Sequence, residues 1–176
     1  MADLGPKALY RTKLTYSDDD ADNDPRRFDE DELGMIRWVH DSTNGLKCYK
    51  FVEVASTSAA LTNGAVVTYT DTIRTLVSDD ISEQHPNWPA GVAIGAIAVG
   101  EKGWIQVQGY HSAIDTDGGD DIAAGDSLIV DPSVDATCDS VAQGTAVTHY
   151  VLGIAQAADV DANNTVAGWI TCLPLA

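Results

Sequence analysis

The sequence predicts an all-β fold: a small glycine-rich β-barrel or sandwich, preceded by an extended N-terminal arm and a hairpin. Short apolar runs alternate with turn signals along most of the chain, as in sandwiches and barrels. No amphipathic helical run of useful length follows residue 62. Residues 94–107 and 152–172 also form a near-repeat, in which a small-residue strand and a polar turn lead into a strand that opens on Gly-Trp. The repeat predicts that Trp104 and Trp169 are matched packing positions in two halves of one barrel.

The N-terminal segment is expected to be an arm followed by an acidic loop. Residues 1–16 are mildly basic and alternate in polarity from Lys7 onward, which is typical of an extended arm or a first strand. Residues 17–32 hold nine acids in sixteen positions. Such blocks repel themselves and normally form loops or disorder.

Residues 33–54 give the clearest hairpin signal in the chain. Period-2 strands at 35–39 and 46–52 flank a turn that contains Asn44-Gly45, a dipeptide strongly favoured in tight turns. The Ala- and Ser-rich stretch 55–61 is expected to be a short helix or a linker.

The remaining residues are expected to form the barrel body. This interpretation divides the chain into residues 1–60, which hold the arm, the acidic loop and the hairpin, and residues 61–176, the body. Gly-rich or Asp-rich turns separate the predicted strands of the body. These strands are 65–70, 73–77, 92–98, 103–109, 127–131, 146–156 and 166–173.

The charge distribution also divides the chain into two regions, with the boundary near residue 50. The chain has 10 Lys and Arg against 27 Asp and Glu, a net charge of −17. Residues 1–50 hold eight of the ten cations and eleven acids, whereas residues 51–176 hold two cations and sixteen acids. This composition excludes nucleic acid as a natural partner, because phosphate binding needs clustered Lys and Arg. The asymmetry predicts that the two regions face different surroundings.

No cofactor or metal site is expected. Cys48, Cys138 and Cys172 are scattered and form no CxxC pair, so they are expected to be small buried apolar residues. The acids from Asp18 to Asp29 imitate calcium-loop spacing, but Asn23 stands where that loop requires glycine. A solvated acidic loop is the preferred interpretation there.

Neither an enzyme nor a membrane protein is expected. The histidines are isolated in the sequence, and no nucleophile elbow is present. The acidic group around Asp117 brackets Gly118-Gly119, which predicts an exposed turn. No apolar run of 18 residues and no N-terminal signal pattern occur. The protein is therefore expected to be synthesised in the cytoplasm as a soluble product. Trp88, in a loop between Asn87 and Pro89, leaves a carbohydrate-binding β module as an alternative.

Two segments resemble virion proteins of tailed bacteriophages. The hairpin from Glu32 to Val52 is similar to the N-terminal hairpin of small virion proteins. The stretch 91–157, with Gly-Val-Ala-Ile-Gly, Ala-Gly-Asp-Ser-Leu-Ile-Val and Val-Leu-Gly-Ile-Ala, resembles the capsid decoration, or cement, proteins of these phages. The resemblance implies a structural protein that binds the outer surface of the capsid, stabilises the shell and contacts the major capsid protein, often as a homotrimer. A head-fibre or tail component is the alternative within the same class.

The resemblance and the charge map together predict which residues touch the capsid or a neighbouring subunit. The arm can add a strand to an exposed sheet edge of a neighbour, and many identical copies supply avidity. The predicted contact residues are the apolar, aromatic and cationic residues of the head: Leu4, Lys7, Leu9, Tyr10, Arg11, Lys13, Leu14, Tyr16, Arg26, Arg27 and Arg37.

Overall fold

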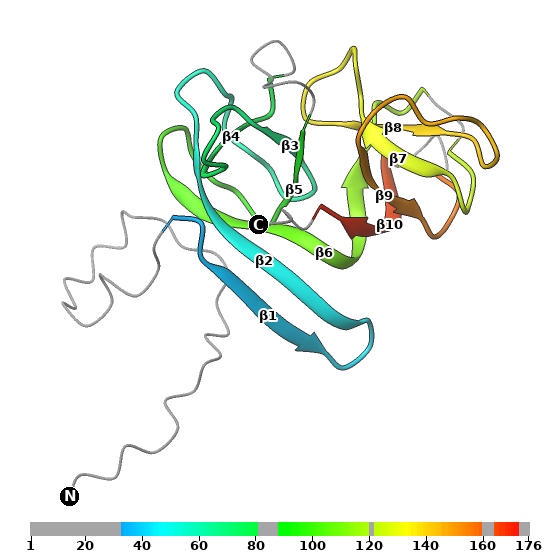
Figure 1. The fold of residues 1–176 in the computed structure, drawn as a ribbon, viewed down its shortest axis with the longest axis horizontal. Helices are drawn as coiled ribbons and strands as arrows, with labels where there is room; N and C mark the ends of the chain where they lie inside the picture. The colour runs from blue at the N-terminus through cyan, green and yellow to red at the C-terminus, as the bar shows by residue number, and fades with distance from the viewer. Residues whose placement is uncertain (1–32, 81–87, 120–121, 160–163, 173–176) are drawn as a thin grey trace, which may run out of the picture.

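The computed structural model describes residues 33–80, 88–119, 122–159 and 164–172, and these residues form ten β-strands and no helix (Figure 1). The all-β prediction is confirmed. All ten strands belong to one hydrogen-bonded sheet that bends around its apolar cores. The strands are β1 (Ile36–Asp41), β2 (Gly45–Val54), β3 (Val66–Tyr69), β4 (Leu76–Ser78), β5 (Pro89–Ala93), β6 (Lys102–Asp115), β7 (Ser127–Val130), β8 (Cys138–Val141), β9 (Val151–Ala155) and β10 (Thr165–Thr171).

Five strands are hydrogen-bonded into a closed ring, in the order β2, β4, β3, β5, β6 and back to β2. β2 and β4 pair in parallel, whereas the other neighbours in the ring are antiparallel. Successive side chains of a strand point to opposite faces, so alternate residues fill the inside of the ring. Val52, Val67, Ile105 and Val107 are completely buried there.

β10, β9, β7 and β8 extend β6 into a second, antiparallel part of the sheet. Its inner face contributes Leu128, Leu152 and Ile170 to a second core. Val66 of β3 and Val92 of β5 belong to the same core, because they point outward from the ring. The two parts of the fold therefore share both a strand and a core.

β6 turns the corner between the two parts. Its first half pairs with β2 and β5, and its second half pairs with β10. Gly109 lies at the change of partner with φ +97°, a conformation that glycine adopts without steric cost. The buried amide of Gln106 donates from Nε2 to the carbonyl oxygens of Gln108, Gly109 and Tyr110 at 3.3, 3.0 and 3.0 Å. These bonds stabilise the bend that Figure 1 shows in β6.

Aspartates fasten several loops of the body. Asp131 is 2% exposed and accepts hydrogen bonds from the backbone N–H groups of Ser133 and Val134 at 2.7 and 3.1 Å. Asp126 accepts from the N–H groups of Ala123 and Gln143 at 2.9 and 3.0 Å. Carboxylates bonded to backbone N–H groups stabilise tight turns. Part of the acidic composition therefore serves the fold rather than a partner.

The strand at 92–98 was predicted too far along the chain. β5 begins earlier, at Pro89, and ends at Ala93. Ile97 forms only an isolated bridge with Leu61, and its side chain occupies the space above Gly103, where an added Cβ would lie 2.5 Å from it. Burial of Ile97, rather than strand pairing, explains the apolar pattern of this segment.

Other strands also differ from the prediction: β4 begins at Leu76 rather than at 73, and β6 continues to Asp115 rather than ending at 109. Residues 146–150 have strand-like composition but remain exposed and unpaired, so β9 begins only at Val151. β8, at Cys138–Val141, was not predicted, because its Asp139-Ser140 centre lacks apolar alternation. Its partner β7 determines its extended form. The stretch 55–61 forms no helix, so the linker interpretation holds.

The expectation that Trp104 and Trp169 are matched packing positions is wrong. Trp104 is 1% exposed and packs against Phe51 with ring centroids 5.1 Å apart. Trp169 is 42% exposed and lies on the outer face of β10. Both tryptophans follow a glycine within their strands, β6 and β10. Side chains of β1 and β2 cover Trp104 but not Trp169.

Candidate interaction surfaces

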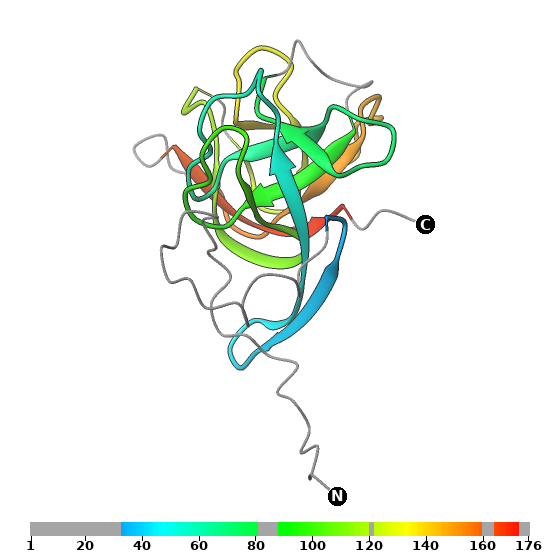
Figure 2. The same cartoon turned by 90° about the vertical axis from the view of Figure 1, so that its left-hand side faces the viewer.

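The β1–β2 hairpin projects from the body, as the two views of Figures 1 and 2 show. The predicted hairpin is confirmed, with Ile36 opposite Lys50 and Asp41 opposite Gly45. In the turn, Asp41 Oδ1 accepts from the N–H groups of Thr43 and Asn44 at 2.8 and 3.0 Å, and Oδ2 lies 3.0 Å from Lys47 Nζ. These contacts hold the pKa of Asp41 well below its usual range, and the hydrogen bond from the N–H of Thr43 has the largest effect.

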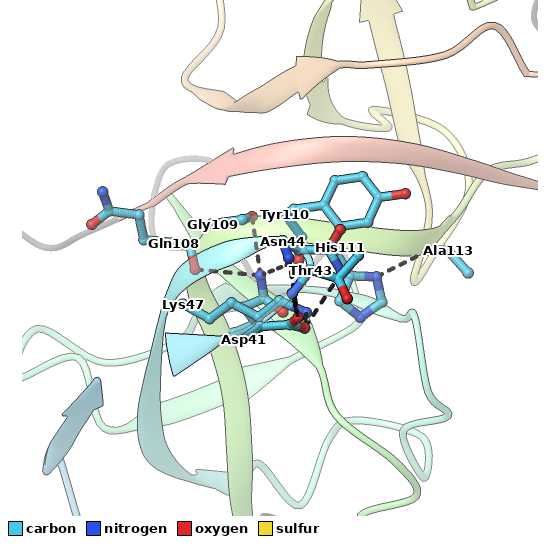
Figure 3. Close-up of polar contacts among 10 residues, drawn as sticks. Asp41, Thr43, Asn44, Lys47, Gln108, Gly109, Tyr110, His111 and Ala113 are labelled. Carbon is cyan, nitrogen blue, oxygen red and sulfur yellow. Dashed lines mark hydrogen bonds and ion pairs between the residues drawn. The ribbon is translucent and has the colours of Figure 1, made fainter. Parts of the chain in front are cut away.

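The base of the hairpin turn rests on the corner of β6 (Figure 3). A Cβ on Gly109 would lie 2.6 Å from the carbonyl oxygen of Leu46 and 3.1 Å from Lys47 Cα. Only glycine permits this approach of the two backbones. The position of the hairpin is therefore determined by the same residue that bends β6.

His111 of β6 is buried close to this contact between the hairpin and β6. Its Nδ1 accepts a hydrogen bond from the N–H of Ala113 at 3.2 Å, an arrangement that requires an unprotonated Nδ1. Burial, and secondarily the charge of Lys47, lower the pKa of His111 from 6.5 to about 4. The imidazole is neutral in the folded protein throughout the neutral range.

The depressed pKa of His111 predicts a pH-dependent stability. The unfolded chain takes up a proton near pH 6.5, whereas the folded protein resists protonation down to about pH 4. Stability is therefore full above pH 6.5 and falls as the pH decreases, by about 2 kcal/mol between pH 7.5 and 5. Urea unfolding at a series of pH values measures this slope.

The matched variants for this prediction are His111→Gln and His149→Gln. The first removes the buried imidazole and is expected to flatten the slope above pH 5. The second changes an exposed histidine and is expected to keep the wild-type slope. Equal slopes in wild type and His111→Gln would show that another group controls the stability in this range.

The two faces of the hairpin differ in burial. On one face, Val39 packs against the cluster of Tyr49, Phe51 and Trp104, and the Arg37 guanidinium lies 4.7 Å from the Trp104 ring centroid. The opposite face exposes alternate residues of β1 together with one residue of β2. We call this set the hairpin face: Ile36, Trp38, His40 and Leu46.

A second exposed surface lies on the outer side of β6, β10 and β9. Trp169 is opposite Tyr110 on one neighbour and opposite Ile154 on the other, and the two aromatic rings meet edge to face with centroids 6.0 Å apart. Tyr110 is half-buried, whereas Ile154 is 48% exposed. We call these three residues the sheet face.

Of the predicted contact residues, only Arg37 lies within the described residues, on β1. Its guanidinium stacks on Trp104 rather than extending from the surface, and its role as a capsid contact stays a prediction. The others fall outside the described residues: Leu4, Lys7, Leu9, Tyr10, Arg11, Lys13, Leu14, Tyr16, Arg26 and Arg27.

Three further cations of the described residues also have partners within the chain. Lys47 pairs with Asp41. Lys50 is buried and donates from Nζ to the Tyr69 hydroxyl at 3.2 Å, and its burial lowers its pKa. The Arg74 guanidinium lies 4.6 Å from the Trp88 ring centroid.

The structure gives no support to Trp88 as a sugar-stacking platform. Arg74 lies over its ring, and Tyr150 meets it edge to face at 6.3 Å. Trp88 is half-buried against the core of the ring. A flat aromatic surface open to a pyranose is therefore not what this residue offers.

The other predicted or excluded sites can be placed only in part. The calcium-like segment from Asp18 to Asp29 lies outside the described residues. Asp117 accepts a hydrogen bond from the N–H of Gly119 in a turn, while burial raises the pKa of Asp115. In the part of the chain that the structure describes, no group of three or more His, Cys, Asp or Glu is arranged to hold a metal ion.

The buried character of Cys48, Cys138 and Cys172 is confirmed, and none forms a disulfide. Within the described ranges no helix has the length and apolarity needed to cross a membrane. The sequence analysis missed the hairpin face and the sheet face as surfaces. Alternation of Ile36 and Trp38 along a strand was a usable signal for the first, but nothing local marks Trp169 as exposed.

A comparison with known protein families matches most of this chain. Residues 47–170, which run from β2 into β10 and make up well over half of the chain, match the family model described as phage cement protein. The search of curated proteins returned no match. The chain belongs to the phage cement protein family, and its role is structural: it binds the phage capsid as a decoration protein.

Proposed function

We propose that this protein is displayed on the outer surface of the capsid as a homotrimer and binds the major capsid protein through its first sixty residues, above all through the arm. The observation that carries the proposal is the charge asymmetry of the chain. Eight of the ten cations lie in residues 1–50, whereas the rest of the chain is almost purely anionic. The strongly anionic body suits the solvent side, because like charges keep neighbouring particles apart.

The internal partners of the described cations sharpen this proposal. Arg37, Lys47 and Lys50 contact Trp104, Asp41 and Tyr69. The other five cations of residues 1–50 are Lys7, Arg11, Lys13, Arg26 and Arg27, all within residues 1–32. We therefore assign the capsid footprint to this segment and the display role to residues 61–176.

Removal of residues 1–16 tests the assignment. The truncated protein is expected to lose cosedimentation with capsid shells assembled without the cement protein, because the arm supplies the shell contact. Its body is expected to stay folded, as seen by near-ultraviolet circular dichroism. Undiminished shell binding by the truncated protein would refute the role of the arm.

Two cation-to-glutamine variants separate the cations from the apolar part of the arm. The triple variant Lys7→Gln, Arg11→Gln and Lys13→Gln is expected to weaken shell binding and to reduce its salt dependence. Lys102→Gln removes a cation of the anionic body and is expected to bind as wild type.

A low-resolution map of decorated particles tests the position of the protein on the capsid. Density at local threefold axes supports the trimer, and density at a single vertex would favour a fibre or tail component.

A further inference from the structure

We propose that copies of this protein bind one another through two unlike surfaces: the hairpin face of one copy packs on the sheet face of the next. The inference rests on the proposed homo-oligomer and names the surfaces that build it. On the hairpin face, Trp38 is 43% and Leu46 52% exposed. On the sheet face, Trp169 and Ile154 expose comparable fractions. Both faces hold aromatic and aliphatic residues of the kind enriched in protein interfaces.

Neither surface contains an Asp, Glu, Lys or Arg; Lys50, which is opposite Ile36, is only 5% exposed and donates to the Tyr69 hydroxyl. β7, β9 and β10 contain no charged residue, and β6 has Lys, Asp, Glu or Arg only at its two ends. The ion pair of Lys47 and Asp41 lies on the other side of the hairpin, since these residues alternate with Leu46 and His40. Exposed apolar residues without interspersed charge mark surfaces that become covered.

The charge of the whole chain argues that a second copy is the occupant. Each copy carries a net charge of −17, so two copies repel one another over most of their surfaces. The uncharged faces are where two copies approach with the least repulsion. A cationic partner would instead gain from contact with the acidic surfaces and would have no electrostatic reason to choose these faces.

The difference between the two faces points to a head-to-tail contact. One face lies on a projecting two-stranded hairpin (Figure 2), and the other on the outer side of the three strands β6, β10 and β9. A contact between two unlike patches leaves one of each free on the pair, so further copies can add until a ring closes. A proposed trimer of this kind would bury both faces on every copy.

Two substitutions test the contact in the full-length protein. Trp38→Thr and Trp169→Thr remove the central aromatic of each face but keep a residue that favours strands. Each is expected to weaken self-association in sedimentation equilibrium by roughly 30-fold or more, as for interface hot spots. Ile73→Thr is the matched control, because Ile73 is 76% exposed but lies on neither face; it is expected to associate as wild type.

Mixing the two variants is the decisive measurement. Trp38→Thr keeps an intact sheet face, and Trp169→Thr keeps an intact hairpin face. An equimolar mixture is therefore expected to form a one-to-one complex, although each variant alone is monomeric at the same concentration. A mixture that stays monomeric would overturn the head-to-tail contact, as would either variant that self-associates like wild type.

The result is distinguishable from a failure of the capsid-binding proposal. Wild-type protein that remains monomeric at the highest concentrations but still binds shells would refute the contact between copies and leave capsid binding intact. Monomeric wild type combined with loss of shell binding in Trp38→Thr and Trp169→Thr would assign these faces to the capsid instead. Circular dichroism and urea unfolding of each variant exclude misfolding as the cause.

Discussion

Replacement of Trp104 by alanine is expected to lower the free energy of unfolding by about 3–5 kcal/mol, the range for large aromatic residues truncated in a core. Trp104 is 1% exposed, stacks against Phe51 and lies under the Arg37 guanidinium. Val39 of β1 and Met35, which precedes β1, pack on the same cluster. The truncation therefore removes both buried area and the surface on which the hairpin rests. Urea unfolding measures the loss, and a decrease in Tm of about 10 °C is expected for a chain of this length.

The repeat supplies the matched control, Trp169→Ala. Like Trp104, Trp169 follows a glycine, but it is 42% exposed and its ring contacts Tyr110. Its truncation is expected to cost about 1–2 kcal/mol, which is the scale of a partly buried cross-strand aromatic pair. Equal losses in the two variants would mean that the two halves of the repeat are structurally equivalent after all.

Replacement of Gly109 by alanine is expected to destabilise the protein by about 3 kcal/mol or more. The residue has φ +97°, which alone costs a side-chain-bearing residue about 1–2 kcal/mol. The added Cβ would also lie 2.6 Å from the carbonyl oxygen of Leu46. Because this neighbour is backbone, the strain is expected to move β2 away from β6 and to loosen the hairpin. Hydrogen exchange of the amides at 46–48 measures the loosening.

Gly144→Ala separates the two contributions. Gly144 has φ +87°, and an added Cβ would meet no atom within 4 Å. This variant is expected to show the conformational cost alone, with unchanged exchange in the hairpin. A loss in Gly109→Ala no larger than that in Gly144→Ala would contradict the claim that close backbone approach positions the hairpin.

Local sequence determined the features that depend on neighbouring residues. The Asn44-Gly45 turn and the period-2 strands on either side predicted the hairpin, because turn conformation and side-chain alternation are properties of a few consecutive residues. The resemblance of residues 32–52 and 91–157 to phage virion proteins predicted a structural protein of the phage capsid, and the family match bears this out. The predicted contact residues Lys7 to Tyr16 remain a prediction that shell-binding measurements can test.

Tertiary structure decided which residues of similar local sequence became buried, exposed or paired. Trp104 and Trp169 follow the same local pattern, but only Trp104 is covered by β1 and β2. β8 is extended because β7 pairs with it, although its own sequence is polar. The corner at Gly109 depends on the approach of Leu46, sixty-three positions earlier in the chain. Each of these outcomes depends on a partner distant in sequence, so the hairpin face and the sheet face became visible only in the folded protein.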